Sequence, residues 1–86
     1  MGIEREVTSV EGGVTIFRKS PWIGLTLEDI SRQYKVIITG YRNNSNGNCK
    51  LKKYNSAVKI YPYIYISFMG SAESVSNLFA AHAIKN

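Results

Sequence analysis

The chain has 86 residues, with 11 Lys and Arg against 6 Asp and Glu, a net charge of +5 and one cysteine, Cys49. A chain of this length forms one domain that buries roughly 60–65% of its unfolded surface, and a lone cysteine excludes an internal disulfide. The residues predict neither a metal site nor a cofactor. No signal peptide, transit peptide or apolar run of transmembrane length is visible in the sequence, which therefore predicts a cytoplasmic protein.

The first residues predict a β-hairpin. β-forming runs at 7–10 and 14–18 are separated by Glu11-Gly12-Gly13. Paired glycines supply the positive φ that tight hairpin turns require, so we expect the chain to reverse at this point.

Two later segments carry the signals of helix starts. Thr26 stands three residues before Asp29, the spacing of a capping box, so we expect a short helix over 26–33. Ser71 can act as the N-cap of a C-terminal helix over 71–83. Each helix has an apolar face, which consists of Leu27, Ile30 and Tyr34 in the first and of Ala72, Val75, Leu78, Phe79 and His82 in the second.

Two segments predict strands of one sheet. Residues 36–42 are rich in β-branched side chains and end in the Asn-rich loop NNSNGN, and residues 63–69 alternate between aliphatic and tyrosine side chains. With the helices and the hairpin, these strands predict an α+β fold. Its expected parts are a small mixed β-sheet with an N-terminal hairpin, one short helix and a C-terminal helix.

The alternation in KIYPYIYISFMG gives this strand two apolar faces. Ile60, Ile64, Ile66 and Phe68 share one face, which predicts a contact with the core. The other face begins with Tyr61, Tyr63 and Tyr65. A small domain rarely leaves such a patch in water, so we expect these three tyrosines to form a homodimer interface. The alternative is that the hairpin or the terminal helix of the same subunit covers these tyrosines.

The sequence does not assemble a catalytic site. The single histidine, His82, lies in an apolar stripe, which predicts a position at the edge of the core or in an interface. Cys49 has no catalytic partner at a recognisable spacing, and Gly12-Gly13 lacks the lysine and the helix of a phosphate loop. We therefore expect a protein that is not an enzyme.

Basic charge with aromatic residues leaves nucleic-acid binding as an alternative function. Single-strand binders stack bases on exposed rings and hold phosphates with Lys or Arg. Residues 43–53 contain three lysines and no acid, but the tyrosine strand has only Lys59 at its start. The basic loop and the aromatic strand are thus separate in sequence, and a solvated loop also accounts for the charge.

Four motifs follow one another along the chain, namely SPWIGLTLEDI at 20–30, YKVIITGYR at 34–42, IYISFMG at 64–70 and SAESVSNL at 71–78. Their order resembles the C-terminal regulatory domain of RCK proteins, the TrkA-C domain, over about two thirds of the chain. On this resemblance, residues 1–12 are an N-terminal extension with the first hairpin strand, and residues 13–86 are a TrkA-C-like regulatory domain.

The resemblance implies a ligand-sensing and dimerisation domain of a cation (potassium) transport or channel system. The implied partners are a second copy of the chain, a small-molecule ligand such as cyclic di-AMP or another nucleotide, and a membrane transporter or channel subunit. By position in the motif, Arg42 would meet a phosphate, and Asn43 and Asn44 would donate hydrogen bonds to the ligand. A surface salt bridge is the alternative role for Arg42.

The chain departs from the family in two places. The family usually has a Gly-Asp turn before its last strand, where this chain has Tyr61-Pro62-Tyr63. It also has no GxGxxG motif of a preceding Rossmann lobe. We therefore expect an altered ligand site, in a domain that is either part of a larger protein or a stand-alone sensor.

Overall fold

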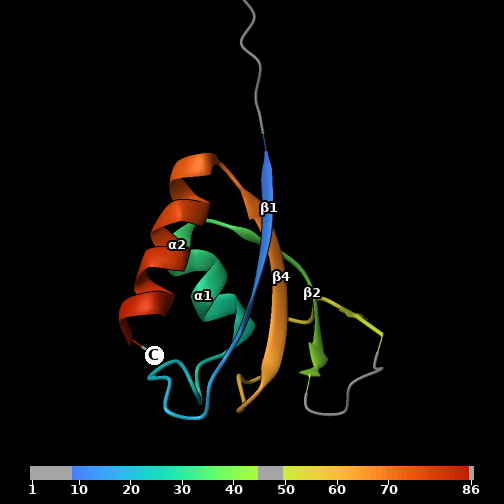
Figure 1. The fold of residues 1–86 in the computed structure, drawn as a ribbon. Helices are drawn as coiled ribbons and strands as arrows, with labels where there is room; N and C mark the ends of the chain where they lie inside the picture. The colour runs from blue at the N-terminus through green and yellow to red at the C-terminus, as the bar shows by residue number, and fades with distance from the viewer. Residues whose placement is uncertain (1–8, 45–49, 86) are drawn as a thin grey trace, which may run out of the picture.

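A computed structural model describes residues 9–44 and 50–85 (Figure 1). Its elements in chain order are β1 (Val10–Thr15), α1 (Leu27–Tyr34), β2 (Ile37–Asn43), β3 (Lys52–Lys53), β4 (Ile64–Gly70) and α2 (Ala72–Lys85). The predicted α+β fold with one short helix and a C-terminal helix is confirmed. Neither helix within the described residues has the length and apolar character that a membrane span would need.

The strands form one sheet in the order β1-β4-β2-β3. All of its ladders are antiparallel, so the sheet is antiparallel rather than mixed. β4 lies between β1 and β2, and its inward side chains Ile64, Ile66 and Phe68 are at most 1% exposed. The predicted core contact of the aliphatic face is therefore confirmed, and Ile60 is buried as well.

The predicted N-terminal hairpin is wrong. Gly12 and Gly13 lie inside β1, opposite Phe68 and Ser67, and neither has a positive φ. Both glycines lie close to aromatic side chains instead. A Cβ on Gly12 would lie 2.7 Å from the Phe79 ring, and one on Gly13 would collide with the Tyr65 hydroxyl. A glycine in a strand can mark such a close approach as well as a turn.

Both predicted helix starts are confirmed. The Thr26 hydroxyl accepts a hydrogen bond from the Asp29 backbone N–H at 3.2 Å, and the Asp29 carboxylate accepts from the Thr26 N–H at 3.0 Å. Ser71 caps α2 by accepting from the Ser74 N–H at 3.1 Å. At the other end of α1, Lys35 takes a left-handed conformation with φ 58°, which ends the helix and leads the chain into β2.

The segment before α1 is held by a long-range pairing. Gly24 donates to the Ile60 carbonyl at 3.0 Å, and Ile60 donates to the Leu25 carbonyl at 2.7 Å. Gly24 has φ 97°, a conformation that favours glycine, which explains a glycine at this position of the SPWIGLTLEDI motif. The pairing places the helix start and Trp22 against the core.

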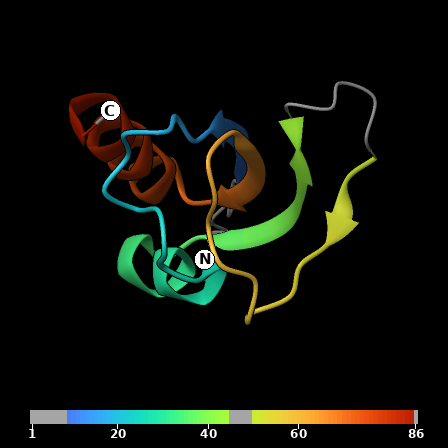
Figure 2. The same ribbon diagram turned by 90° about the horizontal axis from the view of Figure 1, so that it is seen from below.

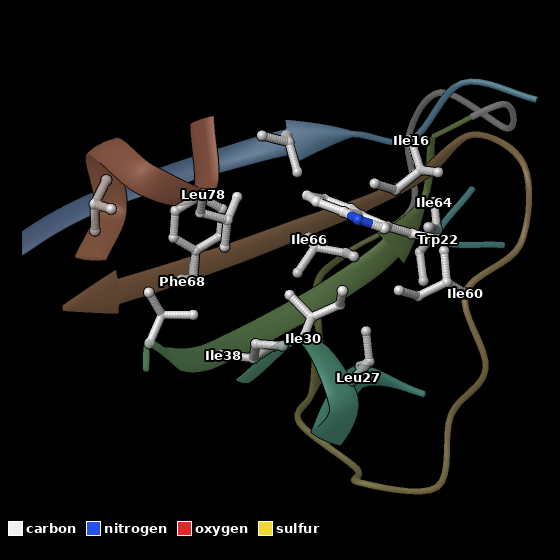
Figure 3. Packing of buried hydrophobic residues seen from close by; sticks show 13 residues of the cluster. Ile16, Trp22, Leu27, Ile30, Ile38, Ile60, Ile64, Ile66, Phe68 and Leu78 are labelled. Atoms are coloured by element: carbon white, nitrogen blue, oxygen red, sulfur yellow. The ribbon is translucent and has the colours of Figure 1, made fainter. Parts of the chain in front are cut away.

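The core lies between the sheet and the two helices (Figure 3). Trp22, Ile16 and Ile64 gather at one end, and Phe68 and Leu78 lie at the other. Burial of each such side chain contributes about 1.5–3 kcal/mol, which is a large part of the stability of a domain of this size.

His82 lies at the edge of this core. The sequence predicts either this position or a position in an interface. Its ring stacks on Phe17 with the centroids 5.9 Å apart and tilts against Trp22 at 5.9 Å. Burial in this apolar surrounding disfavours the charged imidazolium and lowers the pKa of His82 below its ordinary value of 6.5.

We expect the stability of the domain to fall as the pH drops below about 6.5. The unfolded chain then binds a proton at His82 more readily than the folded one, and the loss is complete only below the lowered folded-state pKa. Urea unfolding at about pH 7.5 and about pH 5.5 measures the difference in the free energy of unfolding. The variant His82→Gln should show a weaker pH dependence in this window, and an unchanged dependence would contradict the assignment.

Candidate functional site

One face of the sheet is not covered by either helix. Both helices pack on the opposite face, as the view along the strands shows (Figure 2). The uncovered face, called the open face below, presents alternate residues of the three longer strands. These residues are Glu11, Gly13 and Thr15 from β1, Tyr65, Ser67 and Met69 from β4, and Ile37, Thr39 and Arg42 from β2.

A row of small residues crosses the middle of the open face. Ser67 lies opposite Gly13 on one side and opposite Gly40 on the other. Because these residues project little, a groove of about 500 Å³ forms above them, with Glu11, Thr39, Leu51 and Tyr65 among its lining residues. The Thr39 and Ser67 hydroxyls are hydrogen-bonded at 2.6 Å across its floor.

A β-bulge in β2 turns Arg42 onto the open face. The pairing register of β2 with β4 shifts between Ile38 and Gly40. Ile38 points into the core, so strict alternation would also direct residue 42 inward. The extra residue reverses the phase and places Arg42 opposite Tyr65. Bulges often re-aim a side chain in this way near functional sites.

The Arg42 side chain lies on the Tyr65 ring. Its guanidinium carbon is 4.7 Å from the ring centroid, a cation–π contact of about 0.5–2 kcal/mol. Its Nε is buried and has no hydrogen-bond partner among the described residues. An unsatisfied buried donor costs about 1–3 kcal/mol, and because this Nε is closed to solvent, an anion on the open face would have to bind the terminal nitrogens of the guanidinium. The one ion pair within the described residues joins Arg32 to Glu28 on α1, so the alternative of a salt bridge at Arg42 is not observed.

The two asparagines beside Arg42 are already engaged within the chain. Asn44 donates from its backbone to the Tyr63 carbonyl at 3.1 Å and from its side chain to the Thr15 hydroxyl at 3.3 Å. Asn43 is half-buried and lies opposite Ile64. The structure thus brings the three predicted ligand residues to one end of the sheet, where Asn44 fastens the ends of β1, β2 and β4 together.

The three tyrosines do not share a face, so the common patch expected from the alternation is wrong. Ile64 donates to the Tyr61 carbonyl at 3.2 Å across a turn, and Tyr63 has φ 71°. Tyr61 packs against the core, Tyr63 is 41% exposed in the turn, and Tyr65 lies on the open face. Side chains alternate only in an extended chain, and β4 begins after this turn, at Ile64.

A second cation reaches the open face from β3. Lys53 pairs with Gly40, and directly opposite residues of an antiparallel pair point to the same side. Lys53 is exposed and lies on the face that carries Arg42. Sequence reasoning missed this neighbour because only the pairing of β3 with β2 brings the lysine to the sheet, and neighbouring residues do not specify this pairing. Cys49 lies outside the described residues.

Neither the scan against protein-family models nor the search of the curated proteins finds a match to this chain. The residues of the open face supply a guanidinium, an ammonium, the Glu11 carboxylate, an aromatic ring and hydroxyl groups. Within the described residues, no three His, Cys, Asp or Glu side chains gather closely enough to hold a metal ion.

Proposed function

We propose that this chain is a regulatory ligand-sensing and dimerisation domain of a cation (potassium) transport or channel system, as the TrkA-C resemblance implies. It is not an enzyme in this proposal, and it acts in the cytoplasm. One observation carries the ligand-sensing part. Arg42 is turned out of the core by a bulge, onto the open face, and no ion pair engages it among the described residues.

The open face suits an anionic ligand that has a flat ring, such as cyclic di-AMP or another nucleotide. Arg42 can hold a phosphate with two parallel hydrogen bonds, and Lys53, which lies opposite Gly40, adds a second positive charge on the same face. The groove volume of about 500 Å³ lies within the range of small-molecule sites. Tyr65 joins the two parts, because it lies against Arg42 and lines the groove.

Regulation in this proposal requires two arrangements of the domain pair. A ligand shifts such an equilibrium only by its difference in affinity for the two arrangements. The site lies at the ends of β1, β2 and β4, where Asn44 ties β2 to β1. A ligand bound at Arg42 would in this proposal act on β1, which forms one edge of the sheet, and through β1 on a transporter or channel subunit.

A thermal-shift screen tests the ligand. Cyclic di-AMP, AMP, ATP and potassium ions are each added to the wild-type chain. A nucleotide at about 100 times its Kd should stabilise the fold by about 2.7 kcal/mol, a rise in Tm of roughly 10–20 °C for a domain of this size. The Arg42→Ala variant should show no rise in Tm when the nucleotide is added. The matched control Arg32→Ala removes an exposed arginine of α1 and should keep the rise. No shift with any of these ligands would contradict the proposal.

Nucleic-acid binding is a second candidate, and one observation favours it. The fold brings Lys53 to the same face as Tyr65, although the two are separate in sequence. Lys53 could bind a backbone phosphate, and Tyr65 could stack on a base. A single-stranded oligonucleotide that binds with a steep salt dependence, while the nucleotides fail to shift Tm, would favour this function over ligand sensing.

A further inference from the structure

One side of β1 has no neighbouring strand. Ile16, just after β1, donates to the Ile64 carbonyl at 2.9 Å. By the alternation of an antiparallel ladder, the even-numbered residues of β1 bond to β4, and Glu11, Gly13 and Thr15 direct their backbone N–H and C=O groups away from it. No described residue pairs with that side. Such an edge is a template for another strand.

The two edges of the sheet differ in how they are protected. β3 forms the other edge with only two residues, Lys52 and Lys53, and shortness and lysines both discourage pairing with another chain. β1 is six residues long, with the sequence VEGGVT, and contains neither lysine nor proline. Apart from the charge of Glu11, the protection is thus confined to the β3 edge.

The helix next to β1 has an exposed flank without charge. This flank consists of Ala72, Ser76, Phe79 and Ala83, and all four residues are exposed. Their spacing of four, three and four residues is that of a helix that packs along another helix. Phe79 lies over Gly12, which places the flank on the β1 side of α2. Asn77, by contrast, lines a groove with Tyr34 and Lys35 on the α1 side.

We infer that a second copy of this chain pairs with the edge of β1, with Gly13 opposite Gly13 of the second copy across a two-fold axis. Glu11 then faces Thr15 of the second copy, and about six backbone hydrogen bonds close the pair. The inference rests on the dimerisation part of the proposed function and assigns its interface to β1 and α2 in place of the tyrosines.

The dimensions of sheets and helices fit this arrangement. The axis runs perpendicular to the sheet, so the two α2 helices lie on the same side. Paired strands are about 4.8 Å apart, and a helix that packs on both β1 and β4 lies about 5 Å from the axis. The two helices are then about 10 Å apart, the spacing at which helices pack. The exposed flanks face each other across this distance.

Charge also favours this surface over the others. Each copy has a net charge of +5, so two copies repel each other over most of their surface. The only charged residue of β1 and the α2 flank together is Glu11, which is negative. Two copies can therefore meet along this surface without bringing cations together.

Sedimentation equilibrium over a range of concentrations tests the inference. The wild-type chain of 9.7 kDa should reach twice that mass. Glu11→Pro removes an N–H that faces the second copy and none that bonds to β4, and it should raise the dissociation constant of the dimer at least about tenfold. Glu11→Ala keeps the N–H and should leave the dimer intact. Far-UV circular dichroism checks that each variant is folded.

A second pair of variants tests the helix flank. Ser76→Lys places a cation between the two α2 helices and should weaken the dimer by a similar factor, while Asn77→Lys on the other side of α2 should not. A wild-type chain that remains a monomer overturns the inference. A dimer that neither Glu11→Pro nor Ser76→Lys weakens also overturns it, although dimerisation itself would stand. Loss of nucleotide binding alone would count against the ligand-sensing part only.

Discussion

Phe68→Ala is expected to lower the free energy of unfolding of the domain by about 3–5 kcal/mol. Phe68 lies on β4, the strand between β1 and β2, is 1% exposed and packs against the Phe79 ring with the centroids 5.6 Å apart. Truncation of a buried phenylalanine costs about 3–5 kcal/mol, because it removes buried surface and leaves a cavity. A domain of this size has a stability of only about 4–10 kcal/mol, so this loss is a large part of the total.

Urea unfolding measures this loss against a control on the same sheet. Ile37 on β2 is 65% exposed and points to the open face. Ile37→Ala should change the free energy of unfolding by no more than about 0.5 kcal/mol. A loss below about 1 kcal/mol for Phe68→Ala would mean that this face of β4 does not line the core.

Gly12→Val is expected to destabilise the domain by about 1–3 kcal/mol, although valine is a much better strand former than glycine. A Cβ at this position would lie 2.7 Å from Cζ of Phe79 and 3.2 Å from Cε1 of Phe68. Phe68 is buried and has no room to move, so the strain falls on Phe79 and on the packing of α2.

A double variant separates this packing effect from any effect on the backbone. Phe79 is 40% exposed, so Phe79→Ala alone should cost less than truncation of a core phenylalanine. In Gly12→Val/Phe79→Ala the new side chain gains room, and the double variant should be more stable than the sum of the two losses predicts. Additive losses would show that the Phe79 ring is not what excludes a side chain at position 12.

The elements that the sequence predicted correctly are those decided by neighbouring residues. The capping box of Thr26 and Asp29 is complete within four residues, and it forms as expected. The burial of Ile64, Ile66 and Phe68 follows from the two-residue period of a strand once the chain is extended. Such signals need no knowledge of the rest of the fold.

The predictions were wrong where one residue type fits two different local structures, and only contacts with distant residues decide between the two. Gly12 and Gly13 marked a turn in the sequence and a close approach to Phe79 and Tyr65 in the structure. Tyr61 and Tyr65 are in phase in sequence, but the turn at Pro62 interrupts the strand between them. Pro62 was the available signal, because proline favours the second position of a turn.

The candidate site could be predicted only in part. Arg42 was singled out through its position in the motifs that resemble the TrkA-C domain, but its orientation depends on the bulge between Ile38 and Gly40. A glycine within a strand is a weak sign of a bulge. The cation at Lys53 depends on a strand pairing that local sequence does not specify. The sequence therefore shows which residue types the site contains, but it does not show that the fold brings them to one face of the sheet.

The central claim, that the open face of the sheet binds an anionic ligand through Arg42, is tested most directly by an NMR titration of the labelled chain with cyclic di-AMP. The account predicts shift changes at Arg42, Tyr65 and Gly40, and their loss in Arg42→Ala. Changes confined to the groove between the helices, around Lys35 and Asn77, would contradict it. So would spectra that do not change at any residue.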